Sequence, residues 1–313
     1  MDSLTHDLCD PDVAGAPALR LPGAVAGAEA IRLFGAVYRM LGSACGAWET
    51  VRGALTVTVQ PDVSDLVREV VGAALRRADP ARQRRDGHTW LPEPVLTGRG
   101  ALGPMDTAER RESVSMARLV VLERLPPAER AAYVLREVFG YGAADAAAVL
   151  GVPEARYRAL RRRARHRVQE ADWGAAPRTP DGEAQRWASV GELLHAIREE
   201  DTAALEEALA DDVVAWSDGA GRPDVIRRPV LGAVKVARFL LAAGGRIPDD
   251  AQGHIAEVNG DPALLAVAGG EVVGVLAPEF GAQGMVGIRA VADPARLSFV
   301  SRQWAADRPG HRD

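Results

Sequence analysis

The feature that most constrains how this chain can fold is a helix-turn-helix pattern over residues 126–169. A first helix is expected over 128–139, because prolines precede this segment and glycines follow it. An alanine-rich segment predicts a second helix over 143–150. Gly151 permits a tight turn before a third helix, which is expected over 154–169. Helices joined by turns this short pack on one another, so the pattern predicts a compact helical module.

The third helix of this pattern has two chemically different faces. Its apolar stripe contains Tyr157, Leu160, Ala164 and Val168, whereas seven arginines and one acid lie between 154 and 167. The stripe can dock on the neighbouring helices while the arginines meet phosphates and guanine edges in a major groove. A merely solvated basic helix is the alternative, but the short helix and the glycine turn before it favour DNA binding. The residues expected to contact DNA are Arg156, Arg158, Arg162, Arg163, Arg165 and His166.

The overall charge, taken alone, argues against a nucleic-acid partner, because the chain carries a formal net charge of −5. The acidic residues are segregated, however, and many of them lie in a stretch over 199–224, outside the arginine-rich helix. A local basic face decides phosphate binding, and the whole-chain sum does not. The charge pattern is therefore compatible with DNA binding by the third helix.

The segment 122–168, LERLPPAERAAYVLREVFGYGAADAAAVLGVPEARYRALRRRARHRV, resembles region 4 of an extracytoplasmic-function sigma factor. In that family, region 4 reads the −35 element of a promoter. The resemblance implies base contacts by exposed residues near the start of the third helix, such as Arg156, Arg158 and Arg162. Ala159 stands where family members often have a polar residue, so direct base readout is expected to be thinner here.

A second resemblance lies nearer the N-terminus, where the sequence over 32–43, RLFGAVYRMLGS, is similar to the opening of sigma region 2. In the family this module binds core RNA polymerase. The resemblance implies polymerase contacts by Tyr38, Arg39, Trp48 and Glu49.

Region 2 departs from the family in two respects. The helix that is usually acidic keeps only Glu49, and Gly53 within it disfavours the helix by about 1 kcal/mol relative to alanine. The segment 61–78 contains no aromatic residue, and Asp65 stands where a tryptophan is typical. Promoter opening requires stacking platforms for unpaired bases. We therefore expect the fold to be retained, polymerase contact to be weakened, and promoter opening to be weakened or lost.

The segment after region 2 contains the sequence HTWLPEP over 88–94, which matches a WLPEP motif typical of one subgroup of these sigma factors. Two prolines favour an extended, polyproline-like conformation that leaves the tryptophan free to enter a groove. A rigid spacer is the alternative, and the subgroup match favours a docking segment. The residues expected to dock are Trp90, Leu91, Pro92, Glu93 and Pro94.

The C-terminal block changes character, because helices expected over 188–200 and 202–209 precede several short β-like runs. A helix expected over 233–242 interrupts these runs. This order predicts a small α+β domain. The β-like runs are 213–216, 255–258, 264–268, 272–276 and 286–291.

The subgroup with the WLPEP motif carries a SnoaL-like domain at this place, and three motifs of the block resemble it: VAWSDGAG (214–221), VNGDPAL (258–264) and, as a partial match, ADPARL (292–297). The resemblance implies that the domain acts in cis, in place of a separate anti-sigma protein, through its contact with the linker. The domain residues expected to take part are Asp218, Gly219, Gly221 and Asp293.

Domains of this kind also serve as enzymes, for which Asp218, His254 and Glu257 are the acid–base candidates. Asp218 is more simply explained as a turn residue, and the spacing of His254 and Glu257 is ordinary for a strand edge. We expect no catalytic site and no cofactor. The two cysteines have no metal-ligand spacing, so no metal site is expected either. A small-molecule ligand of the domain stays an open alternative.

The expected fold is multidomain, with two all-α sigma-like domains followed by an α+β SnoaL-like domain. The expected boundaries are a tail over 1–22, region 2 over 23–86, a linker over 87–105, region 4 over 106–171, a second linker over 172–186, the SnoaL-like domain over 187–306 and a tail over 307–313.

The expected function is that of a sigma-factor-like transcription regulator, with promoter DNA and core RNA polymerase as partners. Two alternatives remain: a ligand-binding or catalytic domain fused to a vestigial sigma portion, and a regulator that occupies promoters without opening them. An acidic N-terminus argues against a secretory signal, and no apolar run approaches the roughly 20 residues that cross a bilayer. We therefore expect a cytoplasmic location and no membrane partner.

Overall fold

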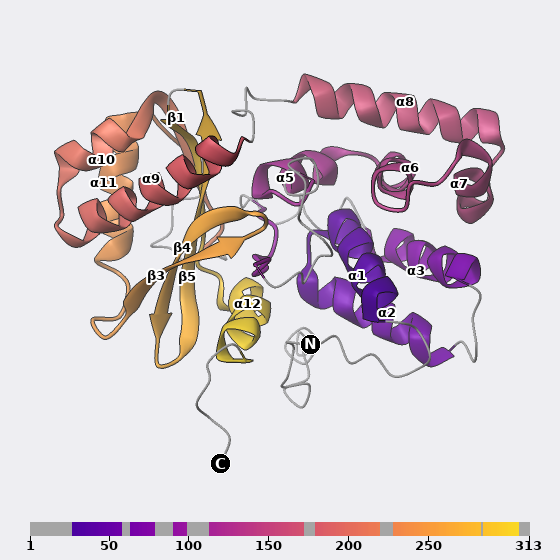
Figure 1. Ribbon diagram of the computed structural model, residues 1–313, viewed down its shortest axis with the longest axis horizontal. Helices are drawn as coiled ribbons and strands as arrows, with labels where there is room; N and C mark the ends of the chain where they lie inside the picture. The colour runs from indigo at the N-terminus through magenta and orange to yellow at the C-terminus, as the bar shows by residue number, and fades with distance from the viewer. Residues whose placement is uncertain are drawn as a thin grey trace, which may run out of the picture. The chain divides into compact units, whose positions relative to one another are not determined.

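The described residues of the chain form two compact units (Figure 1). Unit 1 contains the described residues between 27 and 78 and between 118 and 171, and unit 2 contains 90–98, 113–117 and the C-terminal part from 179 onwards. The WLPEP segment therefore groups with the C-terminal domain. The computed structural model describes residues 27–57, 63–78, 90–98, 113–171, 179–219, 228–282 and 284–306.

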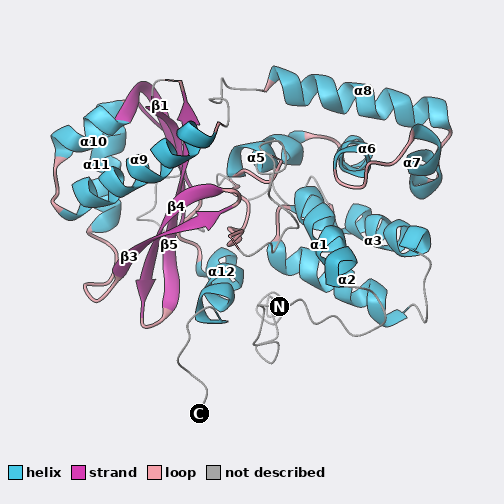
Figure 2. Ribbon diagram, viewed as in Figure 1, coloured by secondary structure: helices cyan, strands magenta, loops and turns pink. Residues whose placement is uncertain are grey.

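Unit 1 is helical, as Figure 2 shows. Its first three helices pack on one another because α1 has a continuous apolar face, on which Leu33, Phe34, Val37 and Tyr38 are fully buried. Gly42, with a φ of 62°, ends α1 in the left-handed conformation that glycine adopts readily. The helices of this unit are α1 (Gly27–Leu41), α2 (Ala44–Val57), α3 (Val63–Arg77), α5 (Met116–Arg124, entered from unit 2), α6 (Pro127–Glu137), α7 (Ala143–Leu150) and α8 (Glu154–Glu170).

The expected helix-turn-helix is present as α6, α7 and α8. Gly151 follows α7 with a φ of 63°, so the tight turn needs a residue without a side chain at this position. Proline stands at the first position of α6, where its missing N–H is not needed. The apolar stripe of α8 is buried against α6 and α7, as the periodicity predicts.

Arg130 joins the two helical groups of unit 1. This α6 side chain is 3% exposed and donates from Nη1 to the carbonyl oxygen of Met40, near the end of α1. It also pairs with Glu123 of α5 at 2.9 Å. Burial raises the pKa of Glu123 to about 7, and the charge of Arg130 opposes that rise. The pair is therefore a buried ionic joint between α1 and α6.

Unit 2 is an α+β domain, which confirms the expected fold class. All five expected β-like runs lie within strands, and the expected helix over 233–242 lies within α11. The unexpected elements are α12 and the short β2, while α9 begins earlier than predicted. The elements are α9 (Pro180–Arg198), α10 (Thr202–Ala208), β1 (Leu209–Ser217), β2 (Val230–Leu231), α11 (Ala233–Gly244), β3 (Gln252–Val258), β4 (Asp261–Ala268), β5 (Glu271–Gly281), β6 (Gly284–Val291) and α12 (Pro294–Ala306).

The strands form a six-stranded sheet in the order β2-β1-β6-β5-β4-β3. Neighbouring strands are antiparallel except for β1 and β6, which run parallel. Asn259 and Gly260 connect β3 to β4 with φ values of 53° and 78°, as a two-residue hairpin turn requires. This turn places Asn259 at one end of the edge strand β3.

The two faces of the sheet carry different helices. Leu264, Ile288 and other buried residues form a core with α9, α10 and α11. Successive strand residues point to opposite faces, so Leu265 and its cross-strand partner His254 lie on the other face. There His254 packs against Trp304 of α12 with ring centroids 4.9 Å apart. Figure 1 shows α12 on the side of the sheet away from α10 and α11.

None of the helices among the described residues combines the length and the apolar character that a bilayer crossing requires.

Candidate nucleic-acid interface and linker-docking site

The six α8 residues that were expected to contact DNA are all exposed. Their backbone is fixed from behind, because Tyr157, Leu160, Ala164 and Val168 are buried. The Tyr157 hydroxyl also donates to the carbonyl oxygen of Ala132 in α6 at 3.3 Å. The structure thus presents an arginine-rich face on a helix whose opposite side is packed against the rest of unit 1. The six residues are Arg156, Arg158, Arg162, Arg163, Arg165 and His166.

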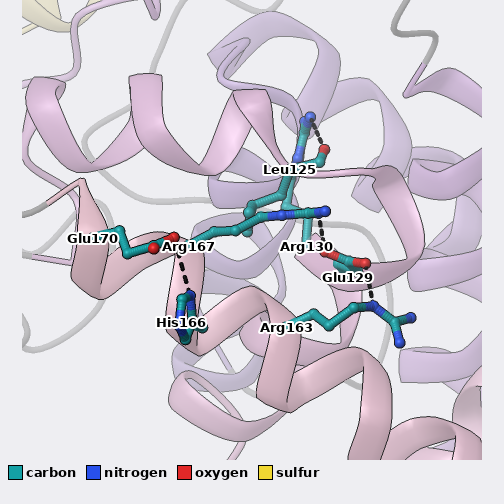
Figure 3. A network of polar contacts seen from close by, with 7 residues as sticks. All are labelled: Leu125, Glu129, Arg130, Arg163, His166, Arg167 and Glu170. Atoms are coloured by element: carbon teal, nitrogen blue, oxygen red, sulfur yellow. Dashed lines mark hydrogen bonds and ion pairs between the residues drawn. The ribbon is translucent and has the colours of Figure 1, made fainter.

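Glu129 of α6 joins α8 to α6 through ion pairs (Figure 3). Its carboxylate is 6% exposed and pairs with Arg163 at 2.7 Å and with Arg167 through its other oxygen. The sequence analysis did not select Glu129. Its pairing with residues 34 and 38 positions away comes from the fold. Arg163 therefore serves the packing of α8 on α6 in addition to any contact with DNA.

The other predicted residues of α8 differ in how firmly they are held. Arg158 pairs with Glu154 at 2.5 Å, and His166 lies 3.0 Å from Glu170, an ion pair only when the imidazole is protonated. Both pairs are exposed and of the i, i+4 type, so they stabilise the helix by only a few tenths of a kcal/mol. A phosphate group can therefore replace the acidic partner in either pair at little cost in free energy.

A hollow of about 270 Å³ lies where α8 meets the end of α6 and the start of α7. Arg136 and Arg161, which the sequence analysis did not select, line it together with three of the predicted residues. A stripe of arginines at i, i+3, i+4 and i+7 along α8 was the signal that could have shown it. The lining residues are Arg136, Tyr141, Ala143, Tyr157, Arg158, Arg161, Arg162 and Arg165.

The residues expected to bind polymerase divide into two pairs. Tyr38 and Arg39 are buried in the core of unit 1, and the Arg39 guanidinium donates to the Gly35 carbonyl oxygen at 2.9 Å. Burial lowers the pKa of Arg39 to about 10. Trp48 and Glu49 are half-buried on α2, and Glu49 pairs with Arg77 of α3 at 2.9 Å. Surface contact with a partner therefore falls to the second pair.

The WLPEP segment lies along the sheet edge of unit 2. Leu91 and Val95 are fully buried, and Leu96 forms an antiparallel bridge with Val258 of β3. Asn259 brackets Val95, because its N–H donates to the Val95 carbonyl at 2.9 Å and its Oδ1 accepts from the Val95 N–H at 3.0 Å. Farther along, the Thr97 N–H donates to the Glu257 carbonyl at 3.0 Å. The segment thus extends the sheet beyond β3, where the sequence predicted a polyproline-like plug.

Arg296 of α12 connects the predicted motifs of the domain to the linker. Its Nε lies 2.9 Å from Asp218 Oδ2, and its Nη1 donates to the Leu91 carbonyl at 2.7 Å. The same guanidinium lies 5.9 Å from the centre of the Trp90 ring. Asp293 is 3.7 Å from the Arg296 Nε. Asp218 and Asp293 thus act on the linker through an arginine that the sequence analysis did not single out.

The remaining members of the predicted linker site contribute in simpler ways. Pro92 and Pro94 are buried. Burial lowers the pKa of Arg302 in α12, and the negative charge of Glu93 opposes that decrease. Gly219 is buried beside Asp218, and Gly221 lies outside the described residues. Gln303 of α12, which was not predicted, binds both backbone groups of Leu96, at 2.9 and 3.2 Å.

Burial raises the pKa of Asp218 to about 7, and the charge of Arg296 opposes the rise. This carboxyl is tied to Arg296 and to the Ala292 N–H. The other two acid–base candidates are engaged as well: His254 packs on Trp304, and Glu257 accepts from the Thr97 hydroxyl at 2.7 Å. Each candidate therefore has a packing or linker-binding role. The described residues contain no cluster of metal-ligating side chains.

An exposed arginine helix in a helix-turn-helix, joined to an α+β domain that binds the linker, defines a DNA-binding transcription regulator. The family model "Sigma-70, region 4" matches residues 119–168. The "ECF RNA polymerase sigma factor SigJ" of Mycobacterium tuberculosis is 34% identical over 236 residues, which span 72% of this chain and 74% of the relative. The chain therefore belongs to the extracytoplasmic-function sigma factors and is a transcription regulator rather than an enzyme.

Two further comparisons agree with this assignment. A "Probable ECF RNA polymerase sigma factor SigI" of Mycobacterium tuberculosis is 29% identical over 84% of this chain and 83% of the relative. The crystal structure of Mycobacterium tuberculosis SigJ superposes with a TM-score of 0.66 at 29% identity, covering 87% of this chain and 97% of that one.

Proposed function

We propose that this chain is a cytoplasmic sigma factor that binds promoter DNA through α8, engages core RNA polymerase, and is controlled in cis by unit 2 through the linker. The exposed arginine face of α8 supports the DNA contact. Sequence-independent phosphate contacts by such a face dominate affinity. The relatives named above carry RNA polymerase in their names, which supports the polymerase partner.

Control in cis rests on the way Asn259 holds two segments of the chain at once. Its backbone N–H and Oδ1 bind Val95, and its Nδ2 donates to the Val114 carbonyl at 2.9 Å. Asn259 and Val114 are buried, at 1% and 0% exposed. Unit 2 therefore binds the chain at Val95, in the linker, and again at Val114, just before α5. These two points lie on either side of the segment that connects the sigma modules, and Asn259 contacts both of them, in addition to the linker contacts of Arg296 and Gln303.

Run-off transcription with core polymerase and full-length variants tests this control. Asn259→Gly keeps the left-handed turn but removes both side-chain grips. We expect transcript yield to rise at least threefold, because the connector is released while α8 is untouched. Lys235→Ala, an exposed change on α11, is the control and should leave the yield unchanged.

Duplex binding by the same proteins should be equal. A yield that stays at the wild-type value in Asn259→Gly would contradict control through the linker.

A regulator that occupies promoters without opening them is a second candidate, favoured by one observation. α3 carries no aromatic residue among its positions, and Asp65, where a tryptophan is typical, is exposed and pairs with Arg68 at 2.7 Å. Stacking of unpaired bases has no platform there. This candidate predicts DNA binding with no transcript from any of the variants. A small-molecule ligand of unit 2 remains a prediction.

A further inference from the structure

The two helical groups of unit 1, α1–α3 and α5–α8, meet where α6 and the α6–α7 turn pack on α1 and α3 (Figure 1). Arg130 of α6 donates to the carbonyl oxygen of Met40. This carbonyl belongs to the last turn of α1, where helix carbonyls lack partners within the helix. The positive charge of an arginine also suits this end of the helix dipole. Arg130 therefore caps a helix of the other group.

Two further contacts cross the same interface. The Arg32 guanidinium of α1 lies 5.6 Å from the centre of the Phe139 ring, just after α6. Tyr141, in the α6–α7 turn, shares a hydrogen bond with the Ser64 side chain of α3. Contacts between polar and charged groups are typical of interfaces that open and close, whereas permanent interfaces are larger and more apolar. These contacts thus have the chemistry of a reversible interface.

The segment that connects the two helical groups is the one that unit 2 binds. It runs from the end of α3 to the start of α5, and Asn259 contacts it at both Val95 and Val114. Because one residue holds both points, the chain between them no longer contributes to the length of the tether, which is shortened by about half. Shortening a tether by half raises the effective concentration of the groups that it joins by about threefold. Docking of the connector therefore favours the closed interface.

We propose that this interface is an autoinhibitory contact, closed while the linker is docked and opened when the linker is released. The inference rests on the proposed control in cis, which can act on the two helical groups only if they can part. A permanent interface would hold the groups together whatever the linker does. While the interface is closed, the groups form one body and cannot engage polymerase and promoter independently. The exposed face of α8 lies outside these contacts, so duplex binding by α8 alone is equal in both forms.

The experiment uses full-length proteins and two readouts, which are amide hydrogen exchange in the α6–α7 turn and run-off transcription with core polymerase. Arg32→Gln/Ser64→Ala removes two of the contacts from the side of α1 and α3 and leaves α2 and α8 unchanged. Asn259→Gly releases the connector from within unit 2. The control is Arg124→Gln, which removes an exposed arginine of α5 that takes no part in these contacts.

In Arg32→Gln/Ser64→Ala, the loss of a cation–π contact and a hydrogen bond should speed exchange in the turn by about threefold or more. The transcript yield should rise by a similar factor. Asn259→Gly should speed exchange in the same turn by about threefold, although the substitution lies in unit 2, because the tether is longer. The control should match wild type in both readouts, and all the proteins should bind duplex DNA equally.

The inference is overturned if exchange in the turn does not change in Arg32→Gln/Ser64→Ala, or if it becomes faster while the yield stays at that of an active wild type. Asn259→Gly that raises the yield but leaves exchange in the turn unchanged also overturns it, and control in cis then stands without this interface. If no protein gives a transcript but exchange responds in both variants, polymerase engagement in the proposed function fails and the coupling of linker and interface is retained.

Discussion

Arg296 is a single side chain on which the linker and the domain motifs converge. It binds the Leu91 carbonyl, faces the Trp90 ring and pairs with Asp218. None of these contacts is local in sequence, since Leu91 and Arg296 are 205 positions apart. Sequence reasoning found Trp90, Asp218 and Asp293 by resemblance but had no means of finding the arginine between them. The same holds for Gln303 and for the double role of Asn259.

The Asp218 carboxyl gives unit 2 a pH dependence. Its pKa in the folded state is about 7, above the ordinary value of 3.8, so the folded state holds the proton between these pH values. Its contribution to stability is therefore fully present below about pH 4 and is lost as pH rises through 7. The loss is on the order of 1–4 kcal/mol, at about 1.4 kcal/mol for each pKa unit.

Urea unfolding at pH 5 and pH 8, followed by tryptophan fluorescence, checks this dependence. Wild type should be less stable at pH 8 than at pH 5. The stability of Asp218→Asn should depend less steeply on pH. Asp212→Asn, an exposed change on β1, is the matched control and should follow wild type. An equally steep dependence in Asp218→Asn would refute the assignment.

The helices and turns that the sequence predicted correctly are those whose signals lie within a few neighbouring residues. The glycine turn, the apolar stripe and the lengths of α6–α8 are signals within a few residues, and the structure contains them as expected. α12 was missed although Asp293 caps it through the Ala295 N–H at 3.0 Å and a proline opens it. The motif around Asp293 was compared only with the family's own motif, and the helix start signal within it was not used.

The exposed arginine face of α8 is expected to contribute most of the affinity for duplex DNA. Arg158→Ala/Arg162→Ala should weaken duplex binding by about tenfold or more at low salt, because two cations near the helix start are lost. A gel-shift titration measures it, with Arg238→Ala on the exposed surface of α11 as the control. Affinity equal to that of wild type would remove α8 from the DNA interface.

The whole molecule consists of two units with separate cores, so we expect two unfolding transitions. Arg130 belongs to only one of them, since it joins α6 to α1 and α5 within unit 1. Arg130→Met leaves Glu123 buried without its partner, which costs about 3–5 kcal/mol.

Differential scanning calorimetry should show one transition lowered by this variant and the other unchanged. Arg124→Ala, an exposed neighbour, should move neither by more than about 0.5 kcal/mol. A single transition that shifts as a whole would mean that the units unfold together.

The pairing of the linker with β3 has a consequence for the protein in a crowded cell. An uncovered edge strand presents unpaired N–H and C=O groups and is a template for aggregation. The linker covers this edge at Val258 and Glu257 while it is docked. Undocking therefore also uncovers an adhesive edge, and a long-lived undocked state calls for another extended peptide to take the vacant place. Under the proposed control in cis, activation of the protein and its solubility therefore place opposing demands on β3.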